Sequence, residues 1–267
     1  MLWRSPLSAA HGILHCRGPF CLRVGFWELV CTRRLTLAGP SPTVVISTVL
    51  LESAEENIQQ EIKSYESTLR SASEYIAGTP QIDRAKWSIY VQRLRILDWY
   101  PGVDSMAVIE PVDSAHLKTF EGEQRQLNHE DFKVHAVVGG EDKPLPEHFI
   151  MVCRAPFSTI AIGSDLATEP RGLYAIETAR GRGEPMFSEH IQIYRGRFGE
   201  TRTAFVLFTA VYRPGAILDS TAERRAALKA VIGTALTVQE FFDSVFAEAI
   251  GQLKIDVFDG RFRSPPW

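Results

Sequence analysis

The residues of this sequence that could do chemistry do not fall into a spacing typical of a catalytic or metal site. The seven histidines are dispersed, and the chain has no zinc-protease, nucleophile-elbow, phosphate-loop or dinucleotide-binding pattern. Ser188 and His190 are close in sequence, but no other feature there indicates a nucleophilic triad. We therefore expect no catalytic residue, no metal ligand and no cofactor, and we do not expect the chain to be an enzyme.

A second group of residues could line a pocket for a small molecule. Such a pocket needs an apolar wall with a few polar groups. Side chains on or beside predicted strands would supply both: Phe157, Ser158, Phe187, Phe208, Thr209 and Tyr212. The alternative is that the aromatic residues are ordinary core. Thr209 interrupts the apolar run 204–208, so its hydroxyl, if buried, must bond to the backbone or to a ligand.

Asp165 and Arg171 are candidate ligand-binding residues at a predicted strand-to-helix junction. Asp165 could face a ligand, or it could cap the free N–H groups at the start of the helix. Arg171, one turn into the helix, could bind an anionic ligand or pair with Asp165 or Glu169. We expect the cap for Asp165 and the local pair for Arg171.

Composition limits the classes of partner and of fold. The chain has 267 residues, 45% of them hydrophobic and 23% charged, which is typical of a globular protein with a sizeable core. Its formal net charge of −3 gives no reason to expect a nucleic-acid partner. The four cysteines show no disulfide or zinc spacing, and Cys153 alternates with apolar residues, which predicts a small buried hydrophobe.

The clearest periodic signal is an apolar stripe with heptad spacing. It predicts a helix of about 25 residues with one apolar seam, ended by the helix-stopping residues 78–80. This helix could be a stalk that pairs with its copy in a homodimer, or it could pack along its own domain. The seam residues proposed for the dimer are Ile58, Ile62, Tyr65, Leu69 and Ile76.

Beyond the stripe, helical and strand patterns are interleaved. Asp83 is a candidate N-cap for a second helix, and residues 100–102 form a predicted turn. Predicted strands cover 103–112, 132–138, 148–154, 159–163, 191–195, 203–212, 230–235 and 254–258, and predicted helices cover 115–127, 168–183, 222–228 and 238–250. The later connections are too short for parallel crossovers, so we expect an antiparallel sheet flanked by helices.

The N-terminal segment differs from the rest of the chain. Residues 1–40 hold three of the cysteines but no clear helix or strand period. We therefore expect them either to be poorly ordered or to be an artefact of a misplaced start codon. Residues 35–51 carry no charge but include Gly39, Pro40 and Pro42. A membrane helix needs about 17–25 apolar residues, so this segment is a marginal candidate, and a surface strand or an interfacial helix is the alternative.

Several stretches, in order, resemble the CHASE family of sensor domains. The strongest is Ile162-Gly163-Ser164-Asp165-Leu166-Ala167-Thr168-Glu169-Pro170-Arg171, which is similar to the family pattern G-F-D-L-x-S-x-P-x-R. The others are Tyr100-Pro101-Gly102-Val103, Val108 to Val112, Phe132-Lys133-Val134, Ala175 to Pro185, Phe205 to Arg213 and Val238 to Asp259. The resemblance covers residues 51–259. Two departures are Ser164, where the family has an aromatic residue, and Ala210, where it has proline.

The resemblance implies a fold, a function and a location. The fold would be α/β (α+β), with a long N-terminal helix followed by two PAS-like subdomains with antiparallel sheets. The function would be extracytoplasmic (periplasmic or extracellular) sensing of an unknown small-molecule ligand in a membrane receptor, such as a two-component histidine kinase or a diguanylate cyclase. Residues 1–50 would precede the domain, 51–99 would form the stalk and connecting helices, 100–259 the sensor core and 260–267 a tail.

We expect the chain to be a fragment without its output domain, and membrane-associated as part of the full receptor. Two alternatives to sensing stay open on the sequence. One is a dimerising interaction module whose functional surface is the seam. The other is an inactive remnant of a sensor kinase or cyclase gene.

Overall fold

The computed structural model describes residues 43–243 apart from 101, 128–130, 138, 141–143, 157–160, 196–199, 238–239 and 242. Before residue 43 it describes the backbone of four short strands. β1 (Ile13–Leu14) pairs with β4 (Leu35–Thr36), and β2 (Phe20–Val24) pairs with β3 (Trp27–Cys31). These strands lie where the sequence shows no clear strand period. Residues 65–241 form a compact unit of their own.

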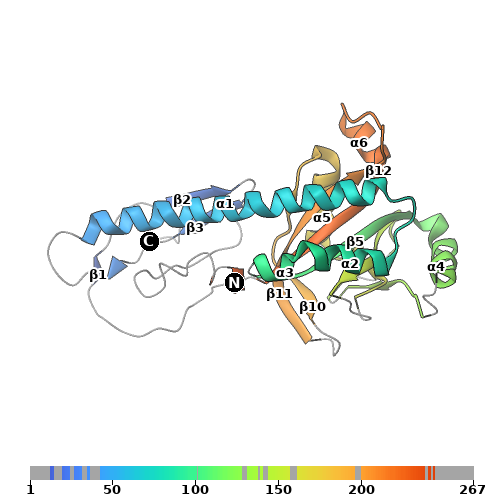
Figure 1. The fold of residues 1–267 in the computed structure, drawn as a ribbon, viewed down its shortest axis with the longest axis horizontal. Helices are drawn as coiled ribbons and strands as arrows, with labels where there is room; N and C mark the ends of the chain where they lie inside the picture. The colour runs from blue at the N-terminus through green and yellow to red at the C-terminus, as the bar shows by residue number, and fades with distance from the viewer. Residues whose placement is uncertain are drawn as a thin grey trace. The chain divides into compact units, whose positions relative to one another are not determined.

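Three helices precede the main sheet (Figure 1). They are α1 (Thr43–Gly78), α2 (Arg84–Leu94) and α3 (Ile96–Trp99). α1 ends at Gly78 as predicted. α2 begins after Asp83, whose side chain accepts a hydrogen bond from the Lys86 amide at 2.9 Å, so the predicted N-cap is confirmed.

α1 and α2 pack side by side through aromatic residues. The rings of Tyr75 on α1 and Tyr90 on α2 are stacked with centroids 4.2 Å apart. Trp87 of α2 is buried, and its indole N–H donates to the backbone oxygen of Met106 in the sheet at 3.2 Å. A buried indole needs such a partner, and this bond holds α2 against the sheet.

The core sheet has eight strands in the described residues, and its order is β10-β11-β12-β5-β7-β8-β6, with β9 paired to β11. All pairings are antiparallel except β6 with β8. The strands are β5 (Val103–Asp113), β6 (His135–Ala136), β7 (Glu147–Ala155), β8 (Ser164–Asp165), β9 (Met186–Phe187), β10 (Ile191–Arg195), β11 (Glu200–Tyr212) and β12 (Leu228–Thr237).

The connecting helices of the core are η1 (Ser114–His116), α4 (Leu117–Gln126), η2 (Leu166–Thr168), α5 (Pro170–Arg182) and α6 (Thr221–Ala227). Each of the last three starts with a local cap. Asp165 caps η2, Glu169 caps α5 before Pro170, and Ser220 and Glu223 form a capping box at α6. α5 ends at Gly183, whose φ of 75° is the left-handed conformation that glycine adopts readily.

The predicted class, an α/β (α+β) fold with a long N-terminal helix and PAS-like antiparallel pairing, is confirmed. The described strands of the core are joined in one sheet. Within it β5, the first long strand along the chain, lies between β12 and β7. Two predicted strands are corrected. Residues 161–163 are a turn, and the strand begins at Ser164. Among the described residues of the region 132–138, only His135 and Ala136 pair as a strand.

Most of the predicted helix 238–250 and all of the predicted strand 254–258 lie outside the described residues. Cys153 is buried as predicted, and burial raises the pKa of its thiol to about 12. Within the part of the chain that the structure describes, no helix has the length and apolar content needed to cross a membrane.

Candidate ligand-binding site

A cavity of about 70 Å³ lies on the face of the sheet that α5 and η2 cover. Its floor is built from small residues on the two central strands. Gly233 of β12 is the register partner of Ala107 of β5, and Ala235 is the partner of Ser105. Because all four side chains are small and adjacent, the sheet surface is low at this point, which leaves space under the covering residues.

The walls of the cavity are mostly apolar. They come from the sheet and from the segments that cover it: Ile109, Val137, Met151, Ala161, Leu166, Gly172, Ile191, Ile193, Val206 and Phe208. The polar residues of the lining are Ser105, Arg154, Ser164, Glu169 and Gln192. An apolar cavity with a few polar groups is the usual character of a small-molecule site. A volume of about 70 Å³ has room for several water molecules or a compact ligand.

Arg154 is the main charged group at the cavity. Its side chain is buried and pairs with Asp104, with Nη2 2.7 Å from Oδ2, while Nη1 donates to the Pro156 carbonyl oxygen at 3.0 Å. Burial lowers the pKa of Arg154 and the Asp104 carboxylate opposes that shift. The pair is therefore neutral overall, so the cavity does not present an unbalanced positive charge to a ligand.

The motif at residues 162–165 holds the cavity wall in place. Gly163 has a φ of 88°, and a Cβ there would overlap the Lys133 carbonyl oxygen. Its amide donates to the Met151 oxygen at 2.9 Å. Asp165 is 2% exposed, and its Oδ1 accepts from the amides of Phe149 and Ala167, each at 3.0 Å. Asp165 thus makes the cap that was predicted and does not line the cavity.

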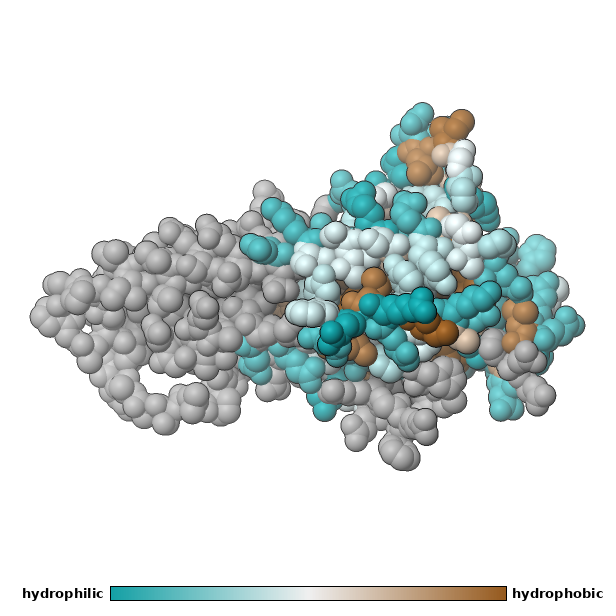
Figure 2. All heavy atoms as spheres, viewed as in Figure 1, coloured by the Kyte–Doolittle hydropathy of each residue, from teal (hydrophilic) through white to brown (hydrophobic). Residues whose placement is uncertain are grey.

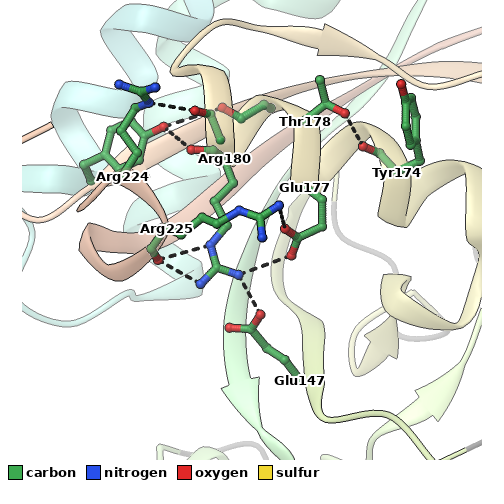
Figure 3. Close-up of polar contacts among 10 residues, drawn as sticks. Glu147, Tyr174, Glu177, Thr178, Arg180, Arg224 and Arg225 are labelled. Carbon is green, nitrogen blue, oxygen red and sulfur yellow. Dashed lines mark hydrogen bonds and ion pairs between the residues drawn. The ribbon is translucent and has the colours of Figure 1, made fainter. Parts of the chain in front are cut away.

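An ion-pair cluster fixes the far end of α5 to its neighbours (Figure 3). Arg180 Nη1 lies 2.6 Å from Glu147 of β7 and 3.2 Å from Glu177 of α5. The same guanidinium donates twice to the backbone oxygen of Arg225 in α6, at 3.1 and 2.8 Å. Arg225 in turn pairs with Glu177 at 3.0 Å. These contacts hold the helix that covers the cavity.

The structure places the predicted ligand residues at several different locations. Phe208 is one of the residues that line the cavity. Phe157 and Ser158 lie outside the described residues. Phe187 on β9 is half-buried and is not part of the cavity lining.

Arg171 does not make the local pair that was expected. Its Nη1 donates to the His190 carbonyl oxygen at 2.7 Å, and its Nε lies 3.5 Å from Glu189, near the β9–β10 connection. The side chain reaches out from α5 toward that connection, so neither Asp165 nor Glu169 is its partner. Arg171 does not line the cavity.

Tyr212 and Thr209 have positions that alternation along β11 explains. Tyr212 is on the same face as Phe208, but its hydroxyl donates to the Arg180 carbonyl oxygen at 2.7 Å and so caps the end of α5. Thr209 follows Phe208 and therefore points to the opposite face of the sheet. Its Oγ1 is buried and has no hydrogen-bond partner among the described residues, so the expected bond is not observed there.

Three of the predicted seam residues on α1 are buried within the chain itself. Tyr65, Leu69 and Ile76 are 1%, 0% and 1% exposed. Tyr65 packs on the Tyr100 ring, with centroids 5.0 Å apart. This part of the stripe therefore packs along its own domain, which was the alternative to the dimer seam. Ile62 is half-buried, and the side chain of Ile58 lies outside the described part of the chain.

Sequence reasoning missed the small-residue floor of the cavity. Ser105, Ala107, Gly233 and Ala235 sit at alternate positions of their strands, which is the one signal that could have placed them on a common face.

A comparison with protein-family models finds the CHASE domain over residues 80–266. The chain belongs to the CHASE family. No curated protein matches the chain at a significant level.

CHASE domains are extracytoplasmic sensor domains of signalling receptors and are not themselves catalytic. The family match includes the whole cavity lining, the motif at residues 162–165 and the ion-pair cluster at the end of α5. The sensor assignment and the cavity therefore concern the same part of the chain.

Proposed function

We propose that this CHASE domain senses a compact, mostly apolar small molecule in the cavity above Ala107 and Gly233. The observation that carries the proposal is the low floor of small residues on β5 and β12, enclosed by apolar walls with few polar groups. A core packed only for stability fills such a space, because interiors approach the density of organic crystals. The ligand would act from the extracytoplasmic side of a membrane receptor.

The strand that carries half of the floor also contacts α1. Lys229 of β12 donates hydrogen bonds to the carbonyl oxygens of Ile76 and Ala77 at 2.9 and 3.0 Å. A ligand that shifts the pairing of β12 would therefore act directly on the C-terminal turn of the long helix. Sensing needs only that the ligand favours one of two arrangements of these elements.

We further propose that the receptor works as a homodimer that pairs through the stripe on α1 N-terminal to Tyr65. Ile58 and Ile62 continue the heptad spacing there, whereas the later seam residues are used by the core. The double substitution Ile58→Ser and Ile62→Ser should then abolish the dimer measured by analytical ultracentrifugation, whereas ligand binding should be retained. Leu69→Ser is unsuitable for this purpose because Leu69 is in the core.

A thermal-shift screen of the chain against a metabolite library tests the sensing proposal. A ligand at 100 times its Kd stabilises the native state by about 2.7 kcal/mol. The stabilisation should be absent in Ala107→Leu, which fills the cavity. It should persist in Val108→Leu, a substitution at the next residue of β5, which does not line the cavity. A ligand that stabilises both variants equally would refute the cavity as its site.

A further inference from the structure

A second pocket, of about 360 Å³, lies beside β5, β12, α4 and residues 80–82 between α1 and α2. Ile109 of β5 lines the sensor cavity, whereas Glu110, the next residue, lines this pocket, so the two spaces are on opposite faces of the sheet. The lining of this polar pocket includes Gln81, Glu110, Glu123, Gln124, Gln126 and Lys229. We propose that the polar pocket binds a small organic cation with a primary ammonium group, held between Glu110 and Gln124.

Gln124 of α4 brings an unsatisfied amide to the polar pocket. The residue is only 9% exposed, and its side chain makes no hydrogen bond to any residue that the structure describes. Buried side-chain amides nearly always have a partner, because an unpaired donor or acceptor away from water is costly. Since Gln124 lines the pocket, a molecule held there is the partner that its amide lacks.

Glu110 brings a half-buried carboxyl group that likewise has no direct partner within the described part of the chain. The nearby cation is Lys229, which is the extra residue of a β-bulge in β12 and so reaches this face of the sheet. All three N–H groups of Lys229 donate to backbone carbonyl oxygens at the end of α1. Lys229 therefore acts on Glu110 only through space, and the carboxyl oxygens stay available to a ligand.

The charges around Glu110 favour a bound cation. Burial raises the pKa of Glu110 to about 7, with an opposing effect of Lys229 and a further rise from Glu123 of α4. Cys153 of β7 also faces this carboxyl, but the pKa of its thiol is about 12, so it stays neutral. An ammonium group favours the ionised carboxylate, so its binding is linked to loss of the proton from Glu110. The affinity should therefore rise with pH until Glu110 is ionised.

The donors and acceptors of the polar pocket fit an organic ammonium ion. A primary ammonium group has three N–H donors and no acceptor, and two carboxyl groups and the Gln124 amide oxygen can accept from it. Phe120 and Leu127 supply apolar surface for a short carbon chain, while α4 itself is mostly hydrophilic (Figure 2). Among the described residues no group of three or more side chains could hold a metal ion, which favours the organic cation.

The polar pocket is independent of the sensor cavity. The two share no lining residue. A failure of the cation proposal would leave the sensor proposal unaffected, and the reverse also holds.

The test is isothermal titration calorimetry of the chain with butane-1,4-diamine, a compact probe with two primary ammonium groups. We expect one saturable site with a Kd below roughly 1 mM at pH 8, which suits a ligand of this size. Glu110→Gln and Gln124→Leu should each weaken binding by at least roughly tenfold, the usual effect of losing a hydrogen bond to a charged group. Glu74→Gln, at an exposed position of α1, is the matched control and should bind as the parent does.

The pH dependence separates a role of the carboxylate from a purely structural one. Binding to the parent should weaken roughly tenfold from pH 8 to pH 6, because a carboxyl with a pKa of about 7 falls from about nine-tenths to about one-tenth ionised. Glu110→Gln should lose this dependence. Butane-1,4-diol, which has the same chain without charge, should not bind at either pH.

Circular dichroism and the thermal midpoint identify any variant that is unfolded. Glu110→Gln removes a half-buried charge, so we expect it to fold at least as well as the parent. Calcium chloride at the same ionic strength tests for general attraction of cations and should not displace the diamine. No saturable binding to the parent, unchanged binding in folded Glu110→Gln, or displacement by calcium would overturn the proposal.

Discussion

Lys229 on β12 caps the C-terminal turn of α1 by donating to the Ile76 carbonyl oxygen at 2.9 Å. The same ammonium group donates to the oxygens of Ala77 and Thr79, so its three N–H donors all have acceptors at the end of one helix. A cation at a helix C-terminus is favourable because the last carbonyls carry partial negative charge. This contact joins the central strand of the sensor sheet to the long helix.

Removing that ammonium should loosen the end of α1. We expect Lys229→Met to lower the free energy of unfolding by ~2 kcal/mol, since it leaves several partly buried carbonyls without their charged partner. Chemical denaturation measures the loss, and amide exchange should increase at residues 76–79. Lys86→Met, at an exposed position of α2, should change the stability by less than ~0.5 kcal/mol. Equal effects of the two substitutions would contradict the cap.

Glu110 on β5 makes the stability of the core depend on pH. Burial raises the pKa of its carboxyl from 4.5 to about 7, with a further rise from Glu123 and an opposing effect of Lys229. These groups line the polar pocket. Between the two pKa values the native state holds a proton that the unfolded state has released. The Glu110 carboxyl therefore lowers the free energy of unfolding more and more as the pH rises from 4.5 to about 7.

Glu110→Gln should remove this dependence. The variant should gain ~3 kcal/mol over the parent at pH 8, because a shift of one pKa unit corresponds to about 1.4 kcal/mol. At pH 4 the two should be nearly equal. Urea unfolding at each pH gives the comparison, and Glu74→Gln on the exposed face of α1 serves as the control. A gain for Glu110→Gln that is the same at pH 4 and pH 8 would exclude the carboxyl as the titrating group.

Thr209 and Thr168 offer a matched pair for the energetics of buried hydroxyls. Thr209 Oγ1 is buried without a described partner. In contrast, Thr168 Oγ1 donates to the backbone carbonyl oxygen of Asp165 at 2.6 Å and accepts from the Val137 amide at 3.1 Å. Thr209→Val should be neutral or stabilise by ~1 kcal/mol, and Thr168→Val should destabilise by ~2 kcal/mol. Thermal unfolding separates them. A cost at Thr209 as large as that at Thr168 would mean that the Thr209 hydroxyl is bonded in solution.

Arg180 should be the most important residue for holding α5 over the cavity. Arg180→Ala leaves Glu147 and Glu177 without their cation and removes two bonds to the Arg225 carbonyl oxygen. We expect a loss of ~3 kcal/mol, as for a partly buried pair that loses one member. Arg70→Ala, on the exposed face of α1, should cost less than ~0.5 kcal/mol. Differential scanning calorimetry of both variants gives the comparison, and equal midpoints would contradict this role.

Local signals in the sequence were sufficient for much of the fold. The stop at Gly78 and the cap at Asp83 depend on residues a few positions apart, so both could be predicted from the sequence alone. The family motif at 162–165 likewise placed Asp165 at a cap. The heptad stripe predicted a long helix, but spacing alone cannot tell which surface covers Tyr65 and Leu69.

The cavity could not be predicted, because it depends on register between distant strands. Ala107 and Gly233 become neighbours only when β5 pairs with β12. Thr209 was grouped with Phe208 because both lie on one strand, whereas adjacent strand residues face opposite sides. Glu110 and Gln124 meet at the polar pocket through the packing of α4 beside β5, and no sequence spacing indicates that arrangement.

The most direct test of the sensor proposal is to follow alanine methyl signals by NMR while a ligand from the metabolite screen is added. The signals of Ala107 and Ala235, on the cavity floor, should shift as ligand is added. Both shifts should saturate with the same Kd as ligand binding. The signal of Ala72, buried on α1, should move less. A ligand that saturates the protein without any shift at Ala107 or Ala235 would contradict the cavity as the sensing site.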